Sequence, residues 1–438
     1  MRRRQQVLLT ITYLLAGCAT DPSAPDDGTT GTGTAGNMGV GGTGGVEGTG
    51  GVMSTATGHS TSTSGGGAAT GGAGGQGEGG SGGEVPIKAC TNPDTWTPTS
   101  LVDAPSERAW HEAVWTGTHM MVWGGLGDGL YLNSGGLYDP ASDTWEATPT
   151  AGAPTARFDD VMVWTGSEVL IWGGRDISGG GTASGARFNP STKTWSPMST
   201  VNAPPPTYEP EGVWTGTELV VWGDDTTAGA RYDPATDTWT PMNESSAPSP
   251  RDGYVMRWTD SELVVWGGRA CADGACPYVS SGGRYNPSTN VWTSTSSAGA
   301  PEGTYWASGV WTGTELIVFG GRTCGLATGC EVATGGRYNP ATDAWSPLEP
   351  NGAPSARHNH SGVWTGDRML IWGGGGDLLD TGGLFDPETS TWVPTTTEGA
   401  PPGRRLHSGV WTDYGFVTWG GVTSEGDASN DGGVYCPP

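Results

Sequence analysis

The chain has 438 residues, and its 79 glycines and 32 prolines make up about a quarter of them, a composition that by itself predicts disorder. The 22 tryptophans contradict disorder for the whole chain, so we expect glycine and tryptophan to be concentrated in different parts. The net charge of −25, from 45 acidic and 20 basic residues, repels phosphate, which argues against nucleic acid and anionic lipid as partners.

The N-terminus has the features of an export signal, which we assign to residues 1–17. Three consecutive arginines precede an apolar run from Val7 to Ala16 that is too short to span a bilayer. The run ends in Leu-Ala-Gly-Cys18, which resembles the lipobox of bacterial lipoproteins. This resemblance implies cleavage before Cys18, lipidation of Cys18, and export to the outer membrane or cell surface, or to a periplasm-facing position. The alternative is an ordinary secretory signal cut just after Cys18 or the next residue.

Residues 18–84 are predicted to form a disordered tether. From residue 19 to residue 84 the chain has no aromatic residue, lysine or arginine, and 25 of these residues are glycine. Such a segment buries too little apolar surface to offset the entropy lost on ordering. We expect it to hold a folded domain away from a membrane, with a root-mean-square reach of roughly 45 Å.

The remaining residues, 85–438, contain seven sequence repeats, the feature that dominates the rest of the chain. Each repeat begins with an anchor: Trp115, Trp164, Trp214, Trp258, Trp311, Trp364 and Trp411. Eight residues later comes an aromatic residue followed by glycine: Trp123, Trp172, Trp222, Trp266, Phe319, Trp372 and Trp419. A second aromatic residue then precedes a Trp by seven positions, in the pairs Tyr138/Trp145, Phe188/Trp195, Tyr232/Trp239, Tyr285/Trp292, Tyr338/Trp345 and Phe385/Trp392.

Each repeat predicts four short strands separated by turns. In the sixth repeat we expect strands at residues 361–364, 368–372, 382–385 and 391–394, because glycine and proline turn residues lie between these apolar runs. No stretch shows sustained helical periodicity. A single four-stranded sheet cannot bury both of its faces, whereas sheets stacked around an axis can. The fold class is therefore expected to be all-β.

A double glycine after a strand, followed by aromatic residues seven apart on a period near fifty, resembles the Kelch repeat. The resemblance covers roughly Cys90 to Pro438 and implies a seven-bladed Kelch-like β-propeller. Departures from the pattern are mild: Gly223-Asp224 replaces one double glycine, and Phe replaces Tyr or Trp at Phe188, Phe319 and Phe385.

The two ends of the repeat region complement each other. The seventh repeat has Tyr435 with no Trp after it, and Trp96 near the start has no aromatic residue before it. We expect three C-terminal strands and one N-terminal strand to share a blade and close the ring. Cys90 and Cys436 occupy the same repeat position at this seam, which favours a disulfide between them.

Six cysteines remain when Cys18 is set aside, an even number that suits an exported protein. Cys271 with Cys276, and Cys324 with Cys330, lie between the second and third strands of repeats four and five. We expect two local disulfides and neither a metal nor another cofactor. The alternative is a four-thiolate metal site, although the spacing differs from the usual Cys-x2-Cys zinc pattern.

The candidate ligand site lies four and five residues before the anchors, positions that should line the mouth of the propeller channel. A scaffold position should repeat, but these positions vary. The aromatic, acidic and imidazole groups among them suit a sugar or a cationic partner. The alternative is that these residues pack against adjacent blades. The candidate binding residues are Trp110, His111, Asp159, Asp160, Glu209, Tyr254, Trp306, Asn359, His360 and His407.

Two sets of arginines recur in register, which predicts a structural role such as stacking on Trp or pairing with acids between blades. One set lies seven residues before the anchor: Arg108, Arg157, Arg251, Arg357 and Arg404. The other directly precedes the third-strand aromatic residue: Arg187, Arg231, Arg284 and Arg337.

We expect a monomeric, membrane-anchored extracytoplasmic module that binds a protein or glycan through the loop face of the propeller. The alternatives are a carbohydrate-active enzyme, with acids and histidines at the channel mouth, and a structural surface protein. No nucleophile elbow or phosphate-binding loop is present in the sequence, so no catalytic residue is assigned. Kelch-like propellers include a copper oxidase and a sialic-acid epimerase, but the oxidase's Cys–Tyr cofactor needs a free cysteine, and all mature cysteines here are expected to pair.

Overall fold

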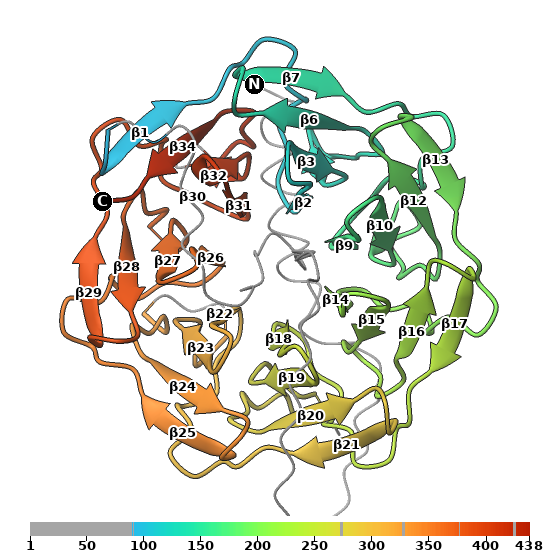
Figure 1. Ribbon diagram of the computed structural model, residues 1–438, viewed down its shortest axis with the longest axis vertical. Helices are drawn as coiled ribbons and strands as arrows, with labels where there is room; N and C mark the ends of the chain where they lie inside the picture. The colour runs from blue at the N-terminus through green and yellow to red at the C-terminus, as the bar shows by residue number, and fades with distance from the viewer. Residues whose placement is uncertain (1–89, 91, 272–274, 326–328, 376, 424–425) are drawn as a thin grey trace, which may run out of the picture. The chain divides into compact units, whose positions relative to one another are not determined.

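The computed structural model describes residues 90, 92–271, 275–325, 329–375, 377–423 and 426–438, and these form seven four-stranded antiparallel sheets around a central axis (Figure 1). This is the predicted all-β, seven-bladed propeller. The predicted signal, the tether and Cys18 lie outside the described residues. Within the part that is described, no helix is long and apolar enough to cross a membrane.

Blades one to three run outward from the axis in chain order. Blade one contains β2 (Glu112–Trp115), β3 (Met120–Trp123), β6 (Gly135–Asp139) and β7 (Thr144–Ala147). Blade two contains β9 (Val161–Trp164), β10 (Val169–Trp172), β12 (Gly185–Asn189) and β13 (Thr194–Pro197). Blade three contains β14 (Glu211–Trp214), β15 (Leu219–Trp222), β16 (Ala230–Asp233) and β17 (Thr238–Pro241).

Blades four to six follow the same order. Blade four contains β18 (Val255–Trp258), β19 (Leu263–Trp266), β20 (Gly282–Asn286) and β21 (Val291–Ser294). Blade five contains β22 (Ser308–Trp311), β23 (Leu316–Phe319), β24 (Gly335–Asn339) and β25 (Ala344–Pro347). Blade six contains β26 (Ser361–Trp364), β27 (Met369–Trp372), β28 (Gly382–Asp386) and β29 (Thr391–Pro394).

Blade seven and the loop strands complete the fold. Blade seven contains β31 (Ser408–Thr412), β32 (Gly415–Trp419), β34 (Gly432–Cys436) and, as its outer strand, β1 (Thr95–Pro98). Two-residue strands in the loops pair as β4 (Leu126–Gly127) with β5 (Leu130–Tyr131), β8 (Arg157–Phe158) with β11 (Arg175–Asp176), and β30 (Arg404–Arg405) with β33 (Val422–Thr423). The pairings of β8 with β11 and of β30 with β33 put blade-to-blade connections beside loops between second and third strands, so both kinds of loop lie on one face of the propeller, the loop face.

Blade six shows why the repeat forms these strands. Its strands differ from the predicted ranges only in that β27 begins one residue later and β28 ends one residue later. The backbone N–H of Thr365 donates to the carbonyl oxygen of Arg368 at 2.9 Å, and Gly366 at φ +109° takes a conformation that other residues rarely adopt. Phe385 and Trp392, seven residues apart, lie directly opposite each other across β28 and β29. The sequence spacing is therefore a cross-strand pair.

The tryptophans join neighbouring blades. The second-strand aromatic residue of every blade contacts the fourth-strand Trp of the next blade, with ring centroids 4.4–5.8 Å apart: Trp123–Trp195, Trp172–Trp239, Trp222–Trp292, Trp266–Trp345, Phe319–Trp392, Trp372–Trp96 and Trp419–Trp145. Aromatic pairs at such distances contribute about 0.5–1.5 kcal/mol each beyond their buried area. These contacts between blades account for 13 of the 22 tryptophans.

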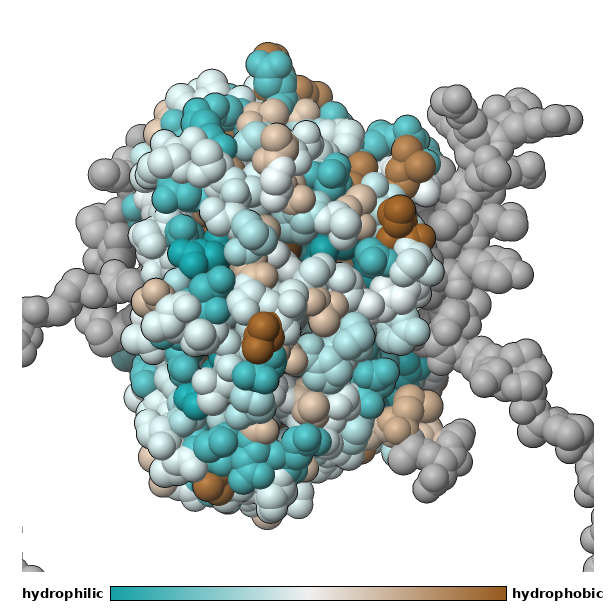
Figure 2. All heavy atoms as spheres, turned by 90° about the vertical axis from the view of Figure 1, so that its right-hand side faces the viewer, coloured by the Kyte–Doolittle hydropathy of each residue, from teal (hydrophilic) through white to brown (hydrophobic). Residues whose placement is uncertain are grey.

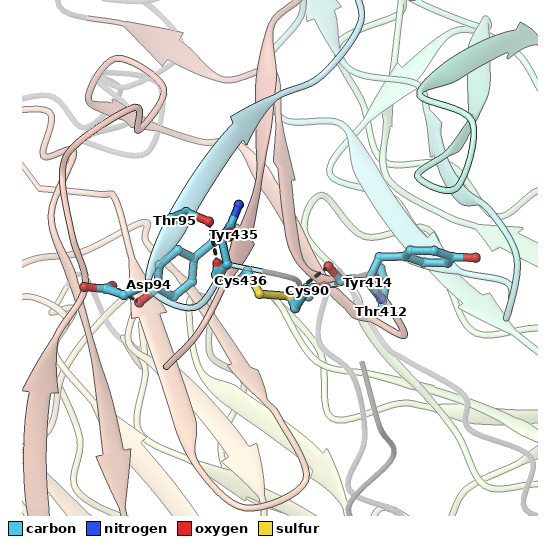
Figure 3. Close-up of a disulfide and its surroundings, with 9 residues drawn as sticks. Cys90, Asp94, Thr95, Thr412, Tyr414, Tyr435 and Cys436 are labelled. Atoms are coloured by element: carbon cyan, nitrogen blue, oxygen red, sulfur yellow. Dashed lines mark hydrogen bonds between the residues drawn. A yellow bond between two sulfur atoms is a disulfide. The ribbon is translucent and has the colours of Figure 1, made fainter. Parts of the chain in front are cut away.

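Strand β1 closes the ring by pairing with β34, in the register Trp96 opposite Tyr435. Figure 3 shows this seam, where Cys90 and Cys436 form a disulfide with Cα atoms 5.4 Å apart. The hydroxyl of Tyr435 donates to Asp94 Oδ1 at 2.7 Å. Tyr138 makes the equivalent bond to Asp143 at 2.8 Å inside blade one. The two ends of the chain therefore rebuild a contact that other blades make within one segment.

The surface of the ring has few exposed apolar side chains. The rim seen in Figure 2 is mainly hydrophilic or intermediate, with hydrophobic residues scattered singly. Among the exposed ones are Val201, Val291 and Val393, of which the last two lie on outer strands. Scattered apolar residues of this kind are usual on a soluble domain and do not mark a site.

Candidate functional site at the channel mouth

A pocket of about 250 Å³ opens where the innermost strands begin. Each innermost strand contacts those of both neighbouring blades, so the pocket lies at the centre of the ring (Figure 1). Nine of the ten candidate binding residues line it: Trp110, His111, Asp159, Asp160, Glu209, Tyr254, Trp306, Asn359 and His407. The structure places His360 outside the lining. Whether the pocket binds a ligand stays a prediction.

The residue five before each anchor belongs to a backbone ring around the mouth. Six of these seven residues have φ between +51° and +59°: Trp110, Asp159, Gly253, Trp306, Asn359 and Leu406. The backbone N–H of Trp306 donates to the carbonyl oxygen of Gly253 at 2.9 Å, and that of Trp110 donates to Leu406 at 3.3 Å. A left-handed conformation is unfavourable for a bulky residue such as Trp. The backbone therefore imposes the geometry of the ring, while the side chains vary.

The residue four before each anchor packs across a blade boundary. A methyl group built on Gly124 would come within 3.1 Å of Asp160 Oδ1, and one on Gly420 within 2.5 Å of His111. His360 lies against Gly320 in the same way, and its Nε2 is 2.7 Å from Ser308 Oγ. The expectation that these positions pack against adjacent blades also holds, so they are both joint residues and pocket residues.

Three charged pocket residues were missed by the sequence analysis. Glu112 and Glu211 are the first residues of β2 and β14, three positions before their anchors, and Arg257 lies one position before its anchor on β18. The first residue of the innermost strand is Val or Ser in the other five blades. Two acids in a position otherwise filled by small or apolar residues were a signal that the sequence contained.

The acids of blades two and three meet one arginine. Arg175 Nε lies 3.6 Å from Asp159 Oδ2, and Arg175 also pairs with Glu209. Burial raises the pKa of Glu209 to about 7, although Arg175 acts in the opposite direction. Burial and the nearby Glu209 likewise raise the pKa of Asp159 well above its ordinary value. Desolvation therefore outweighs the ion pair at this site.

Three further acids have raised pKa values. Burial raises the pKa of Asp160 to about 8, against the lowering effect of Arg157. Burial, followed by the charges of Asp160 and Glu211, raises the pKa of Glu112 well above its ordinary value. The pKa of Glu211 rises to about 7, chiefly through burial and in spite of Arg257. The pocket therefore holds part of its acids in the protonated form at neutral pH.

The histidines of the mouth are neutral. Burial lowers the pKa of His407 to about 3, and Arg404 adds to the effect. Burial, Arg108 and His407 lower the pKa of His111 well below its ordinary value. Neutral imidazoles do not offset the charge of the acids. The basic groups that do so at the acidic side of the pocket are Arg157, Arg175, Arg257 and Arg269.

The recurrent arginines seven positions before the anchors are structural, but mostly not through the predicted contacts. Arg108 lies over the Trp419 ring at 6.0 Å and Arg404 pairs with Asp431 at 2.8 Å, as predicted. Arg357 Nη1 donates to the carbonyl oxygens of Gly373 and Thr381 at 3.0 and 2.7 Å, and its Nε donates to Ser355 at 2.8 Å. Equivalent bonds to the first glycine of the double-glycine pair recur at Arg108, Arg157, Arg251 and Arg404. The prediction of acid pairing is wrong for most of this set, because these guanidinium groups instead satisfy backbone carbonyls at the base of the loops.

The second arginine set pairs with acids, although within single blades and not between blades as predicted. Each arginine on a third strand meets a glutamate that precedes the second strand of its own blade: Arg187–Glu168, Arg231–Glu218, Arg284–Glu262 and Arg337–Glu315. Since these contacts lie within single blades away from the mouth, they contribute nothing to the candidate site.

The remaining cysteines form local disulfides. Cys271 is bonded to Cys276 and Cys324 to Cys330, with Cα atoms 4.0 and 5.5 Å apart. These bonds replace the alternative of a four-thiolate metal site. Among the described residues no group of three or more His, Cys, Asp or Glu side chains is arranged to hold a metal ion.

The geometry defines a seven-bladed β-propeller whose blades carry the double-glycine, Tyr and Trp pattern of Kelch repeats. Residues 58–268 match the family model of the KLHDC2/KLHL20/DRC7 Kelch-repeats domain. The match begins within the predicted tether and ends in blade four, so this part of the chain is similar to a Kelch-repeat domain. No curated protein was found to match the chain.

Proposed function

We propose that this protein is an interaction module that binds a protein partner at the channel mouth. The observation that carries the proposal is the pocket itself, which is lined by the residues that differ from blade to blade. A position that only supports the scaffold would keep one residue type, as the arginines bonded to glycine carbonyls do. Pockets at the centre of a rigid fold with a few converging polar groups are the usual place for recognition.

The test is a peptide-display selection on the purified full chain. We expect peptides that bind the wild type and lose most of their affinity for Trp306→Ala, because Trp306 lines the pocket. The control is Val393→Ala, an exposed position on the outer strand β29, which should bind as the wild type does. Near-ultraviolet circular dichroism checks that both variants are folded. Selected peptides that bind Trp306→Ala unchanged would contradict the proposal.

A glycan is the second ligand class that we propose for the same pocket. The support is chemical, because aromatic faces beside carboxylates suit sugar rings. A glycan array probed with the wild type and with Trp306→Ala tests this directly. Saturable binding that the variant loses would favour a glycan, and an array without binding would leave the peptide result to decide.

Raised pKa values are the observation that favours an enzyme as a second function. Asp160, with a pKa of about 8, and Glu211, with a pKa of about 7, are protonated to a large extent at neutral pH. Such carboxyl groups can act as general acids in sugar chemistry. Turnover of a glycan that is lost in Asp160→Asn would support the enzyme. Binding without turnover would support the interaction module. If neither binding nor turnover were found, the alternative of a structural surface protein would remain.

We further propose that the module is exported and anchored by a lipid at Cys18. The arginine-rich start, the short apolar run and the cysteine that follows it support this proposal. Labelled fatty acid should enter the wild type and not Cys18→Ala. Equal labelling of the two proteins would contradict the anchor, while exclusive recovery from the cytoplasm would contradict export.

A further inference from the structure

Two of the seven joints between blades pair an imidazole with a hydroxyl group at the inner positions. His111 Nε2 lies 2.8 Å from Ser408 Oγ of the preceding blade, and His360 Nε2 lies 2.7 Å from Ser308 Oγ. In each case the residue four before an anchor meets the residue three before the previous anchor. An imidazole and a hydroxyl complement each other as donor and acceptor, so these two joints are stable without an additional group.

The joint between blades one and two has two acids in the same positions. Asp160 takes the place of the imidazole and Glu112 takes the place of the serine hydroxyl, and both line the pocket. Asp160 is 3% exposed, and neither oxygen of its carboxyl group has a hydrogen-bond partner. A buried carboxyl group without a partner is costly, and such groups in folded proteins call for an explanation.

The neighbouring basic groups are committed to other contacts. Arg157 donates to the carbonyl oxygens of Gly173 and Ser184 at 2.8 and 2.7 Å. Arg175 pairs with Asp159 and Glu209. Arg257 Nε donates to the carbonyl oxygen of Gly309 at 2.8 Å. The acidic joint therefore faces an open pocket in which acids outnumber the basic groups.

We propose that this joint receives a primary ammonium group of the partner, either a lysine side chain or a free N-terminus, between Asp160 and Glu112. The inference rests on the proposed interaction function and adds the chemistry of the partner. An ammonium group is compact and has three donors, so it can bond both carboxyl groups at once. A planar guanidinium group is larger and fits less well between them. The pocket volume of about 250 Å³ suits one side chain better than a drug-sized ligand, for which pockets of roughly 300–1,000 Å³ are typical.

The test measures the affinity of defined peptides for the full chain by isothermal titration calorimetry. The lysine probe is acetyl-Gly-Gly-Lys-Gly-Gly-amide, and matched probes carry norleucine or arginine in place of lysine. A pentaglycine amide with a free N-terminus is the other ammonium source. We expect one or both ammonium peptides to bind at least about tenfold more tightly than the norleucine peptide, with arginine between them. The stronger of the two ammonium peptides identifies the source.

Three variants assign the binding to the joint. Asp160→Asn and Glu112→Gln should each weaken the ammonium peptide by about tenfold or more, because each removes one charge-assisted bond. Glu146→Gln makes the same change of charge on the outer strand β7, where the side chain is 52% exposed, and should leave binding unchanged. Thermal melting confirms that each variant is folded. Asp160 has no internal bond to lose, so Asp160→Asn keeps the test valid if Glu112→Gln proves unstable.

Four results would overturn the inference. These are a norleucine peptide that binds as tightly as the stronger ammonium peptide, an arginine peptide that binds as tightly as that peptide, unchanged binding to Asp160→Asn, and no binding of any probe at millimolar concentration. The proposed function fails separately. Displayed peptides that bind at the mouth without a required amine would refute the ammonium site and leave the interaction module standing.

Discussion

The substitution Asp160→Asn should change how the free energy of unfolding depends on pH. The carboxyl group of Asp160 is buried without a hydrogen bond, and its pKa in the folded protein is about 8, against 3.8 for an ordinary Asp. The folded state therefore keeps a proton that the unfolded state releases between these two pH values. Because this pKa is raised on folding, the contribution of Asp160 to stability is greatest below pH 3.8 and falls as the pH rises toward 8.

The size of the effect follows from the shift. Each pH unit within this window costs the wild type about 1.4 kcal/mol, so about 3 kcal/mol is lost between pH 5 and pH 7. Asparagine cannot ionise, and any penalty for its buried amide is independent of pH. The free energy of unfolding of Asp160→Asn relative to wild type should therefore rise by about 3 kcal/mol over this range. The other acids of the pocket contribute to the free energy of unfolding of both proteins, so their contributions largely cancel in the difference.

The assay is denaturant unfolding followed by tryptophan fluorescence, without reductant, at several pH values from 4.5 to 8.5. The seven Trp-containing blade contacts make fluorescence a sensitive probe of the ring. Glu146→Gln serves as the control, because the carboxyl group that it removes is exposed. Its free energy of unfolding should stay close to that of the wild type at every pH. A difference between Asp160→Asn and wild type that is constant with pH would refute the reasoning.

Three further predictions concern the framework that holds the mouth. Arg357→Met should lower the free energy of unfolding by more than about 3 kcal/mol, measured by denaturant titration, since it leaves buried carbonyl oxygens without donors. Replacing Cys90 and Cys436 together by alanine should cost about 3–5 kcal/mol by the same measurement, because the bond closes a sequence separation of 346 residues. Gly320→Ala should lower the melting temperature clearly more than Gly313→Ala. Both glycines have positive φ, but only at Gly320 would the new methyl group come within 2.8 Å of backbone.

Matched controls give these predictions a clear outcome. Arg368→Met, at a half-exposed arginine, should cost less than about 1 kcal/mol, and a cost equal to that of Arg357→Met would contradict the carbonyl argument. Removing the Cys271–Cys276 bond should cost less than removing the seam bond, because its loop spans a separation of only 5. Equal melting temperatures of Gly320→Ala and Gly313→Ala would show that the close approach at Gly320 does not affect stability.

Local patterns were sufficient to predict the blades and the seam. The spacing of seven between Phe385 and Trp392 corresponds to a cross-strand pair, and Tyr435 lies opposite Trp96 although they are at opposite ends of the described chain. These features could be predicted because the same spacing of aromatic residues recurs from repeat to repeat. The partner of each recurrent arginine could not, because the same spacing is compatible with stacking, acid pairing or carbonyl bonding. Arg357 bonds carbonyls, while Arg337 pairs with Glu315.

The candidate site was predicted in position but not in detail. The residues four and five before each anchor, apart from His360, do line the pocket, because the strand start that follows them is fixed by the repeat. Glu112 and Glu211 were missed because only two positions per repeat were considered. The joint of His360 with Ser308 links residues 52 apart in sequence, and such contacts between neighbouring blades follow only from the three-dimensional register.

The most direct test of the central claim is to find where a bound peptide lies. A photo-reactive benzoylphenylalanine placed at Trp110, in the pocket, is compared with one at Val393, on the outer strand, using a peptide obtained by display selection on the wild type. Recognition at the channel mouth predicts crosslinking from position 110, none from position 393, and loss of the crosslink with excess unlabelled peptide. Crosslinking from position 393 alone would contradict the account.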